Sequence, residues 1–300
     1  MLKNRIKNFI KIFGVNISKN HPVSWIKIIY FLRFKKFLNL KNPKNLNEKI
    51  LYLSLKTDTT KWTELSDKYL VRNYVKEQIG EDKLVKLYGV WDNPNKIDLK
   101  NLPPSFILKT NHGSGDNLIV NNKSEIDKSS LNQIFPNLNK PYFGNGAEKH
   151  YEKIKPLIIA EELLENDEES SKYSSSIIDY KCWCFNGKCE YIWVCTNRTK
   201  SGFNIMLYDK DWVAHPEFLS LNKFYKRGVI MPRPNNINEV IATVEKLAKP
   251  FPCVRVDLYL IKNKIYFGEM TFTSHGGMMV SYTQEFLNKA GQLIDVNYSF

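Results

Sequence analysis

The chain has 300 residues, of which 43% are hydrophobic and 13% aromatic, and this composition excludes a disordered or fibrous protein. Basic residues exceed acidic ones by 13, but residues 1–49 alone hold twelve lysines and arginines against one acid, Glu48. The surplus therefore belongs to an N-terminal arm, and we expect no nucleic-acid-binding surface over the whole protein.

Three absences in the sequence indicate where the protein works. The five cysteines are odd in number and lack zinc-site spacing, which fits a reducing compartment with free thiols. The N-terminus shows no signal-peptide pattern, and the apolar runs are too short to span a bilayer. We expect a soluble, cytoplasmic protein.

Residues 1–45 predict a basic amphipathic helical arm. Two stretches repeat apolar residues at helical spacing with lysine and arginine between them. The second stretch carries its apolar face on Trp25, Ile28, Ile29 and Leu32. Such helices suit an anionic membrane surface, here the inner face of the cytoplasmic membrane, but most apolar stripes pack on a neighbouring domain. The pattern favours packing and leaves peripheral membrane binding open.

Residues 46–105 predict helices followed by an α/β region, and the first informative motif comes next. FILKTNHGSGDNLIV, residues 106–120, reads as strand, glycine-rich turn and strand. Its tip, Gly113-Ser114-Gly115, can bring backbone N–H groups to an anion that Lys109 also reaches. The order of residues excludes a Walker loop and a dinucleotide fingerprint. The alternatives are a phosphate-binding hairpin and an ordinary hairpin with a flexible tip.

A second hairpin is predicted around Asn186-Gly187, the strongest two-residue turn signal. A regular ladder from that turn places Cys184 opposite Cys189. The same ladder puts four cysteines on one face and three other residues on the opposite face. The first set is Cys182, Cys184, Cys189 and Cys195, and the second is Asp179, Lys181 and Trp183. A metal site and a disulfide are conceivable, but buried free cysteines favour core packing.

A third hairpin, residues 254–272, carries two acids. If the loop at Lys262 holds three residues, Asp257 faces Glu269 and Arg255 faces Thr271 on one side of the ribbon. A two-residue loop would put the two acids on opposite faces. Opposed carboxylates are unfavourable without a cation between them, and Mg²⁺ held together with substrate phosphates would supply one. The alternative is a solvated strand face with screened charges, and the apolar neighbours favour the metal.

The loop at residues 273–278 follows this hairpin and is polar and glycine-rich, which suits an acidic substrate. Its single histidine, His275, is interpreted as a hydrogen-bonding loop residue in preference to a catalytic base.

The order of these parts resembles the ATP-grasp fold, and within it the TupA-like family of teichuronopeptide biosynthesis. Besides the hairpins at 106–120 and 254–272, the resemblance rests on five strings, NLNEKILYLSL (45–55), DKYLVRNYV (67–75), IIAEELLE (158–165), DYKCWCFNGK (179–188) and DKDW (209–212). It covers about residues 40–290. It implies an α+β fold in which two subdomains, 106–165 and 166–300, clamp ATP.

The resemblance also implies a role for each matching residue. Lys109 and the Gly113-Ser114-Gly115 tip would hold phosphates, and the hinge from Glu161 through Glu162 to Leu164 would read adenine with its backbone. Asp179 and Lys181 would face ribose or phosphate, with Lys181 also catalytic. Arg255 would stabilise the transferring phosphoryl group. The Mg²⁺ ligands would be Asp257, Glu269 and Thr271, where Thr271 replaces the asparagine usual in ATP-grasp ligases and is a weaker ligand.

The activity implied is that of an ATP- and Mg²⁺-dependent carboxylate–amine ligase acting through an acyl phosphate. The family's setting is cell-surface polysaccharide or glycopeptide biosynthesis, where an amino acid would be joined to a uronic acid on a small-molecule or glycan acceptor. Three alternatives stay open. They are a phosphotransferase acting on a sugar, a glycosyltransferase using Asp209 and Asp211 as a D-x-D motif, and a non-catalytic scaffold.

Overall fold

A computed structural model describes residues 18, 20–113, 115, 117–126, 131, 135, 138 and 146–299. Residues 1–17 and 19 of the predicted N-terminal arm and Ser114 of the glycine-rich tip lie outside the described residues. Among the described helices, none combines the length and the apolar character that a membrane span requires.

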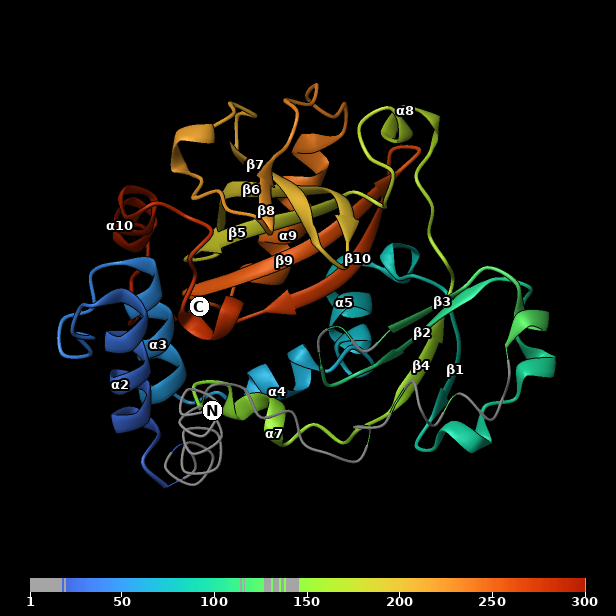
Figure 1. Cartoon of the computed structure of the whole chain (residues 1–300), viewed down its shortest axis with the longest axis horizontal. Coiled ribbons are helices and arrows are strands. Elements are labelled where there is room, and N and C mark those ends of the chain that lie inside the picture. Colours follow the sequence, from blue (N-terminus) through green and yellow to red (C-terminus); the bar gives the residue numbers. More distant parts are fainter. Residues whose placement is uncertain are drawn as a thin grey trace, which may run out of the picture.

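Helices surround two β-sheets (Figure 1). The α-helices are α2 (Pro22–Phe34), α3 (Leu46–Lys56), α4 (Thr60–Ser66), α5 (Val71–Ile79), α7 (Lys149–Glu152), α8 (Glu168–Ser171), α9 (Ile237–Ala248) and α10 (Gln284–Gln292). Short 3₁₀ turns are η1 (Glu81–Lys83), η2 (Pro94–Lys96), η3 (Leu99–Asn101), η4 (Lys123–Glu125), η6 (Pro216–Phe218) and η7 (Ser274–Gly277). A capping box between Asn45 and Glu48 starts α3, and Gly80, with φ of 98°, ends α5.

Four strands form a small sheet in the order β1-β4-β2-β3. They are β1 (Leu87–Trp91), β2 (Phe106–Thr110), β3 (Asn117–Val120) and β4 (Ile158–Glu161). The predicted hairpin at 106–120 is present as β2 and β3, which pair antiparallel with Lys109 opposite Asn117 at the tip. One face of this sheet packs on its own apolar cluster, which includes Phe106, Leu108 and Ile158.

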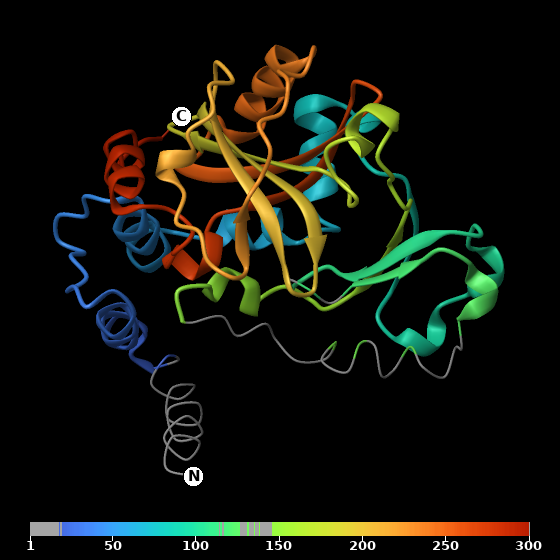
Figure 2. The same ribbon diagram turned by 45° about the horizontal axis from the view of Figure 1, so that its top comes forward.

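Six strands form the large sheet in the order β10-β9-β5-β6-β7-β8. They are β5 (Asp179–Phe185), β6 (Lys188–Thr199), β7 (Gly202–Asp209), β8 (Tyr225–Arg227), β9 (Cys253–Ile261) and β10 (Lys264–Thr271). Helix α9 contacts β5, β6 and β9 and covers one face of the sheet. Edge strand β10 lies beside the small sheet, and Leu84, just before β1, bridges to Phe267 (Figures 1 and 2).

The β9–β10 hairpin has the predicted pairing of Asp257 with Glu269, but a bulge produces it and not the predicted three-residue loop. Its loop has two residues, Lys262 and Asn263, with φ of 50° and 61°, and Lys264 pairs with Ile261. This loop alone would separate the two acids. A bulge at Gly268 adds one residue to β10, so that Glu269 faces Asp257 and Thr271 faces Arg255 after all.

The β5–β6 hairpin also contains a bulge, and here it overturns part of the prediction. Cys184 pairs with Cys189 as predicted. Beyond that pair Glu190 has no partner, so every later pairing shifts by one and Cys195 lies opposite Asp179. The prediction that all four cysteines share a face is therefore wrong for Cys195, because the regular ladder left out the bulge.

Helix α2 packs on the main domain with a face that matches the predicted one only in part, since Ile29 of the predicted stripe packs against this part of the core and Trp25 is half-buried. Ile26 and Tyr30 are buried against Leu51 and Met278. Of the predicted stripe, Ile28 and Leu32 are exposed to solvent. Both packing and an exposed apolar surface therefore occur on one helix.

Candidate active site

Pairing across three strands sets charged residues in one row on the face of the large sheet opposite α9. Glu269 of β10 pairs with Asp257 of β9, and Asp257 pairs with Lys181 of β5. Side chains of directly paired residues lie on the same face of a sheet. The predicted grouping of Asp257, Glu269 and Lys181 is therefore present in the fold.

Arg255 joins the two carboxylates. Its Nε and Nη2 donate to Asp257 Oδ1 and Oδ2 at 2.7 and 2.8 Å, and Nη2 also lies 3.3 Å from Glu269 Oε1. Nη2 donates to the Thr271 hydroxyl at 3.1 Å, and Nη1 donates to the Ser274 hydroxyl at 2.7 Å. The guanidinium thus relieves the repulsion that the sequence analysis assigned to a metal ion.

Lys181 and Asp179 extend this network along β5. Lys181 Nζ donates to Asp257 Oδ2 and lies 3.0 Å from Asp179 Oδ2, which also accepts from Arg198 at 2.8 Å. Burial disfavours the charged forms, but Arg255 and Lys181 lower the pKa of Asp257 to about 2. Burial also opposes the charge of Lys181, yet Asp179 and Asp257 raise its pKa overall. Asp257 and Lys181 are therefore charged at neutral pH.

The small sheet presents its own ion pairs. Lys109 Nζ lies 2.5 Å from Glu161 Oε2, and Arg72 of α5 lies 3.2 Å from Glu161 Oε1. The Glu161 side chain, only 6% exposed, thus orients a predicted phosphate-binding lysine. Gly115 has φ of 92°, a conformation that favours glycine, and a side chain there would meet open space.

Lys68 connects the glycine-rich tip of the small sheet with the β9–β10 hairpin of the large sheet. The sequence analysis did not assign it a role. Its Nζ donates to the Gly113 carbonyl of the glycine-rich tip at 2.7 Å and lies 3.8 Å from Glu269 Oε2. Burial lowers the pKa of Lys68, against the opposing effect of Glu269. The glycine-rich tip and the carboxylate hairpin therefore meet at one ammonium group.

The remaining predicted residues lie around this cluster. The hinge from Glu162 to Leu164 leaves the small sheet after β4, and the Glu162 N–H donates to Lys86 O at 2.9 Å. His275, in η7, is solvent-exposed and lies 3.4 Å from the Tyr225 hydroxyl, and desolvation by the groups around its ring, together with the charge of Arg255, lowers its pKa to about 4. It is a neutral loop residue in this structure.

Four functional candidates escaped the sequence analysis, namely Lys68, Arg72, Arg198 and Ser274. Lys68 and Arg72 both fall within DKYLVRNYV, which was quoted for the resemblance but not examined for charge. Their spacing of four residues was the available signal, because it places side chains on the same side of a helical segment. Arg198 and Ser274 gave no such signal, since only the folded sheet brings them to Asp179 and Arg255.

Comparison with known proteins identifies the family of the chain and several solved structures to which it is similar. The sequence model described as TupA-like ATPgrasp matches residues 48–295. Comparison with curated protein sequences gives no significant match.

Two of the similar solved structures are of D-alanine–D-alanine ligase from Bacillus anthracis, each 14% identical to this chain. The first covers 83% of this chain and 65% of its own, with a TM-score of 0.41. The second, complexed with ATP, covers 89% and 77% with a TM-score of 0.44.

N5-carboxyaminoimidazole synthetase from Staphylococcus aureus, complexed with ADP, is 16% identical over 76% of this chain and 52% of its own, with a TM-score of 0.40. The chain thus spans less than two thirds of the first of these three structures and about half of the last. Since the family model covers most of the chain, including every residue of the charged cluster, the chain belongs to the TupA-like ATP-grasp family and has the α+β fold of that family.

Proposed function

We propose that the protein is an ATP-dependent carboxylate–amine ligase that works through an acyl phosphate. The observation that carries the proposal is the position of Lys68, 2.7 Å from the Gly113 carbonyl and 3.8 Å from Glu269. A ligand held by the glycine-rich tip would thereby lie next to the two acids of the β9–β10 hairpin. Membership of the ATP-grasp family supports a nucleotide as that ligand.

The charge of the cluster supports a polyphosphate. The ion pairs described above involve six cations, Lys68, Arg72, Lys109, Lys181, Arg198 and Arg255. They involve four carboxylates, Glu161, Asp179, Asp257 and Glu269. A surplus of positive charge in a partly buried cluster stabilises an anion entering the site. We assign its phosphates to Lys109 of β2, to Lys68 in the turn before α5, and to Lys181 of β5.

The donor set also fits Mg²⁺ that is shared with phosphate oxygens. Asp257, Glu269 and Thr271 offer hard oxygen atoms. Within the part of the chain that the structure describes, no three acidic, histidine or cysteine side chains are grouped to hold a metal by themselves. Such a site needs ligands from the nucleotide, which is how Mg²⁺ is usually held. When bound, the ion would neutralise charge that develops on the phosphates.

In the reaction proposed, a substrate carboxylate oxygen bonds to the γ-phosphorus while the bond to ADP breaks. An amine then attacks the acyl carbon, loses a proton and displaces phosphate. Both steps need in-line positioning and charge neutralisation. Lys181 and Arg255 Nη2, the guanidinium nitrogen nearest Glu269, are assigned to the transferring phosphoryl group. Asp179 holds Lys181, Glu161 holds Lys109, and the backbone of Glu162 to Leu164 is assigned to adenine.

Nucleotide binding is tested by thermal shift with Mg²⁺ present. We expect ATP to raise the unfolding temperature and UDP-sugars to leave it unchanged. Lys68→Met and Lys109→Ala should each weaken the response to ATP, whereas Lys61→Met, on an exposed face of α4, should not. A full ATP response in both site variants would rule out this nucleotide site.

Ligase and phosphotransferase chemistry differ in their intermediate. Hydroxylamine converts an acyl phosphate to a hydroxamate, so a hydroxamate formed with a carboxylate acceptor supports the ligase. ATP turnover with a sugar alcohol and no hydroxamate would indicate the phosphotransferase. ATP binding without turnover across a full substrate panel would indicate the scaffold.

The glycosyltransferase alternative receives no support from the proposed D-x-D acids. Asp209 Oδ1 accepts from the N–H groups of Asp211 and Val213 at 3.0 and 2.9 Å, and Oδ2 lies 3.2 Å from His215. Asp209 therefore has a structural role in the turn after β7.

We further propose that the setting is assembly of a cell-surface polysaccharide or glycopeptide, with a uronic acid as the carboxylate and an amino acid as the amine. An anionic membrane is the proposed partner of α2, because Ile28, Leu32 and Phe37 are 49, 56 and 85% exposed beside Lys27, Lys35 and Lys36. Ile28→Ser/Leu32→Ser should lower co-sedimentation with vesicles containing phosphatidylserine. Equal co-sedimentation of variant and wild type would contradict membrane binding by α2.

A further inference from the structure

The face of the large sheet that carries the charged row continues into a group of aromatic rings toward β8. Trp193 of β6 pairs with Lys181 of β5 and therefore lies on the same face. Measured between ring centroids, Tyr225 of β8 and His275 of η7 lie 6.2 and 6.3 Å from Trp193. Because the strands follow the order β10-β9-β5-β6-β7-β8, these rings lie on the side of Lys181 that is away from β10 and the glycine-rich tip.

Tyr225 and His275 together offer a hydrogen-bond donor to a ligand. His275 Nε2 lies 3.4 Å from the Tyr225 hydroxyl, and the histidine ring is neutral. If the hydroxyl donates to Nε2, the N–H at Nδ1 is left to donate, and if Nε2 carries the hydrogen, the O–H of the tyrosine is left. His275 is exposed and Tyr225 is half-buried, so a ligand in solution can reach the pair.

Arg33, in the last turn of α2, brings a positive charge to this pair. It acts on both rings, since it adds to the lowering of the pKa of His275 by desolvation and by Arg255, and it opposes the rise that desolvation causes in the pKa of Tyr225. The residue is exposed, and no acid pairs with it in the described part of the chain. A cation without an acidic partner, beside two hydrogen-bonding rings, is suited to bind an anion.

Arg198, near the end of β6, is a second cation next to the pair and is held by two contacts. Its guanidinium lies 4.4 Å from the centroid of the Phe203 ring and donates to Asp179 at 2.8 Å. Phe203 pairs with Tyr225 across β7 and β8, and the charge of Arg198 acts on the Tyr225 hydroxyl. The Arg198 side chain is still 46% exposed, so it can contact a ligand in an orientation that the protein has already fixed.

The order of these groups along the sheet indicates which substrate they contact. Lys68 joins the glycine-rich tip to Glu269 of β10, which places ADP on that side in the proposed reaction. Lys181 and Arg255 are assigned to the transferring phosphoryl group. The amine attacks the acyl carbon bonded to that group, so it approaches from the side of the aromatic rings. An amine that carries a carboxylate needs a cation there that the phosphates do not use.

We propose that the two arginines and the Tyr225–His275 pair bind the carboxylate of the amine substrate, so that the enzyme selects an amino acid over the corresponding amide. The inference rests on the proposed ligase function and adds the residues that recognise the amine. A planar guanidinium matches a carboxylate through two N–H donors, and the ring pair supplies a third donor. A second carboxylate on the acceptor has the same chemistry. Hydroxylamine separates the two sources, because it replaces the amine and has no carboxylate.

The test is steady-state kinetics of the full chain with ATP, Mg²⁺ and glucuronate, in which the common amino acids, their amides and hydroxylamine serve as amines. All of them attack the same acyl phosphate, so the ratio of kcat/KM for an amino acid to kcat/KM for its amide reports recognition of the amine. We expect this ratio to be at least about ten in the wild type, since charge-assisted hydrogen bonds are worth that much.

The variants remove one arginine at a time. Arg33→Met and Arg198→Met should each lower the ratio by at least about fivefold, mainly through a higher KM for the amino acid. Arg33→Met should raise the KM for hydroxylamine less than the KM for the amino acid. Arg33→Lys keeps the charge but not the paired donors, and it should retain part of the selectivity.

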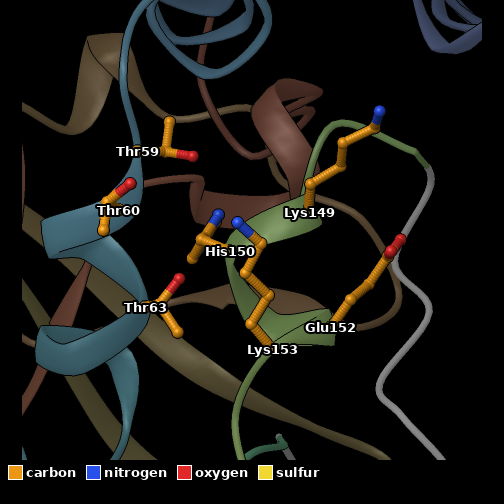
Figure 3. Close-up of a pocket in the computed structure, with 7 residues that line it drawn as sticks. All are labelled: Thr59, Thr60, Thr63, Lys149, His150, Glu152 and Lys153. Atoms are coloured by element: carbon orange, nitrogen blue, oxygen red, sulfur yellow. The ribbon is translucent and has the colours of Figure 1, made fainter.

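Two lysines outside this surface provide matched controls. Lys226 follows Tyr225 in β8 and faces the other side of the sheet, because neighbouring residues of a strand alternate. Lys149 lines a separate hollow where α4 meets α7, and none of the residues around that hollow belongs to the charged cluster or to the aromatic rings (Figure 3). Lys226→Met and Lys149→Met should each select the amino acid over its amide as the wild type does.

The outcomes separate this inference from the ligase function. Formation of the hydroxamate without use of any amino acid, equal use of amino acid and amide, or an unchanged ratio in both arginine variants would overturn the inference and leave the ligase function standing. An equal rise in the KM for hydroxylamine and for the amino acid in Arg33→Met would also overturn it, because it would assign the arginine to the acceptor. Absence of any hydroxamate would instead contradict the ligase function itself.

Discussion

The β5–β6 and β9–β10 hairpins of the large sheet have the same construction, but their bulges lie at different distances from the charged cluster. Both turn through two residues with positive φ, Asn186-Gly187 and Lys262-Asn263, and both contain one bulge. In β5–β6 the unpaired residue is Glu190, close to the turn and away from the charged cluster. In β9–β10 it is Gly268, directly beside Glu269.

The register shifts at the two bulges move different side chains from one face of the sheet to the other. At Glu190 the shift moves Cys195 to the face of Lys181 and leaves three cysteines under α9. At Gly268 the shift brings Glu269 opposite Asp257, so the two acids proposed to bind Mg²⁺ share one face only because of the bulge. A residue without a side chain can therefore determine whether two acids lie on one face.

The largest effect should come from removing one charge in each hairpin by the same substitution. Glu269→Gln takes a carboxylate from the row formed with Asp257 and Lys181 and should lower ATP turnover at least about a hundredfold, because charge stabilisation of this kind is worth that much. Glu190→Gln, at the bulge of the other hairpin, should stay within about twofold. Steady-state kinetics measures both, and equal turnover of the two variants would remove Glu269 from the site.

The next prediction compares alanine substitutions at Gly268, in the bulge of β9–β10, and at Gly187, in the turn of β5–β6. A Cβ on Gly268 would lie 2.9 Å from the Asp257 carbonyl oxygen, so Gly268→Ala should disturb the register of Glu269 and lower turnover more than about tenfold. Gly187→Ala meets a positive φ of 76° and close contacts of 3.0 to 3.2 Å with Tyr298 and the Lys249 backbone, and should cost at least about 1 kcal/mol of unfolding free energy with turnover of the folded protein unchanged. Urea denaturation and kinetics on each variant give the comparison. Normal turnover in Gly268→Ala would show that the bulge tolerates a side chain.

Much of the candidate site could be predicted from local sequence signals. The Asn186-Gly187 turn, the lysine before a glycine-rich tip, and the alternation around Asp257 each follow from a few adjacent residues, and the structure contains all three features. Bulges are harder to predict, because a single extra residue leaves the alternation on either side intact. The predicted three-residue loop gave the correct pairing of Asp257 with Glu269 for the wrong reason.

Contacts between elements that are distant along the chain could not be predicted from the sequence. Lys68 reaches both Gly113 and Glu269 only after two sheets come together, and Arg198 reaches Asp179 only across the β5–β6 pair. The predicted apolar stripe of α2 was right only in part for the same reason, because Ile29 packs on the core while Ile28 and Leu32 are exposed. Which face of a helix is buried depends on its partner, here α3, and the helix alone offers more than one stripe.

The pH dependence of stability isolates the buried acid of the β9–β10 hairpin. Because the folded protein lowers the pKa of Asp257 from 3.8 to about 2, the acid stabilises the fold above pH 4 and loses this contribution as the pH falls toward 2. The difference in unfolding free energy between wild type and Asp257→Asn should therefore shrink by roughly 2 kcal/mol between pH 4 and pH 2. A difference that stays constant over this range would mean that Asp257 is not held by Arg255 and Lys181.

The last comparison tests which residues share each face of the β5–β6 hairpin. Both Cys184 and Cys195 are buried, but only Cys195 shares its face with Asp179 and Lys181. A serine hydroxyl at 195 could hydrogen-bond to those charged groups, whereas at 184, under α9, it would enter apolar surroundings. Cys184→Ser should therefore lose about 1–3 kcal/mol of unfolding free energy and Cys195→Ser less. The KM for the nucleotide should change only in Cys195→Ser. A larger loss of unfolding free energy in Cys195→Ser than in Cys184→Ser would contradict the placement of Cys195 on the charged face by the bulge at Glu190.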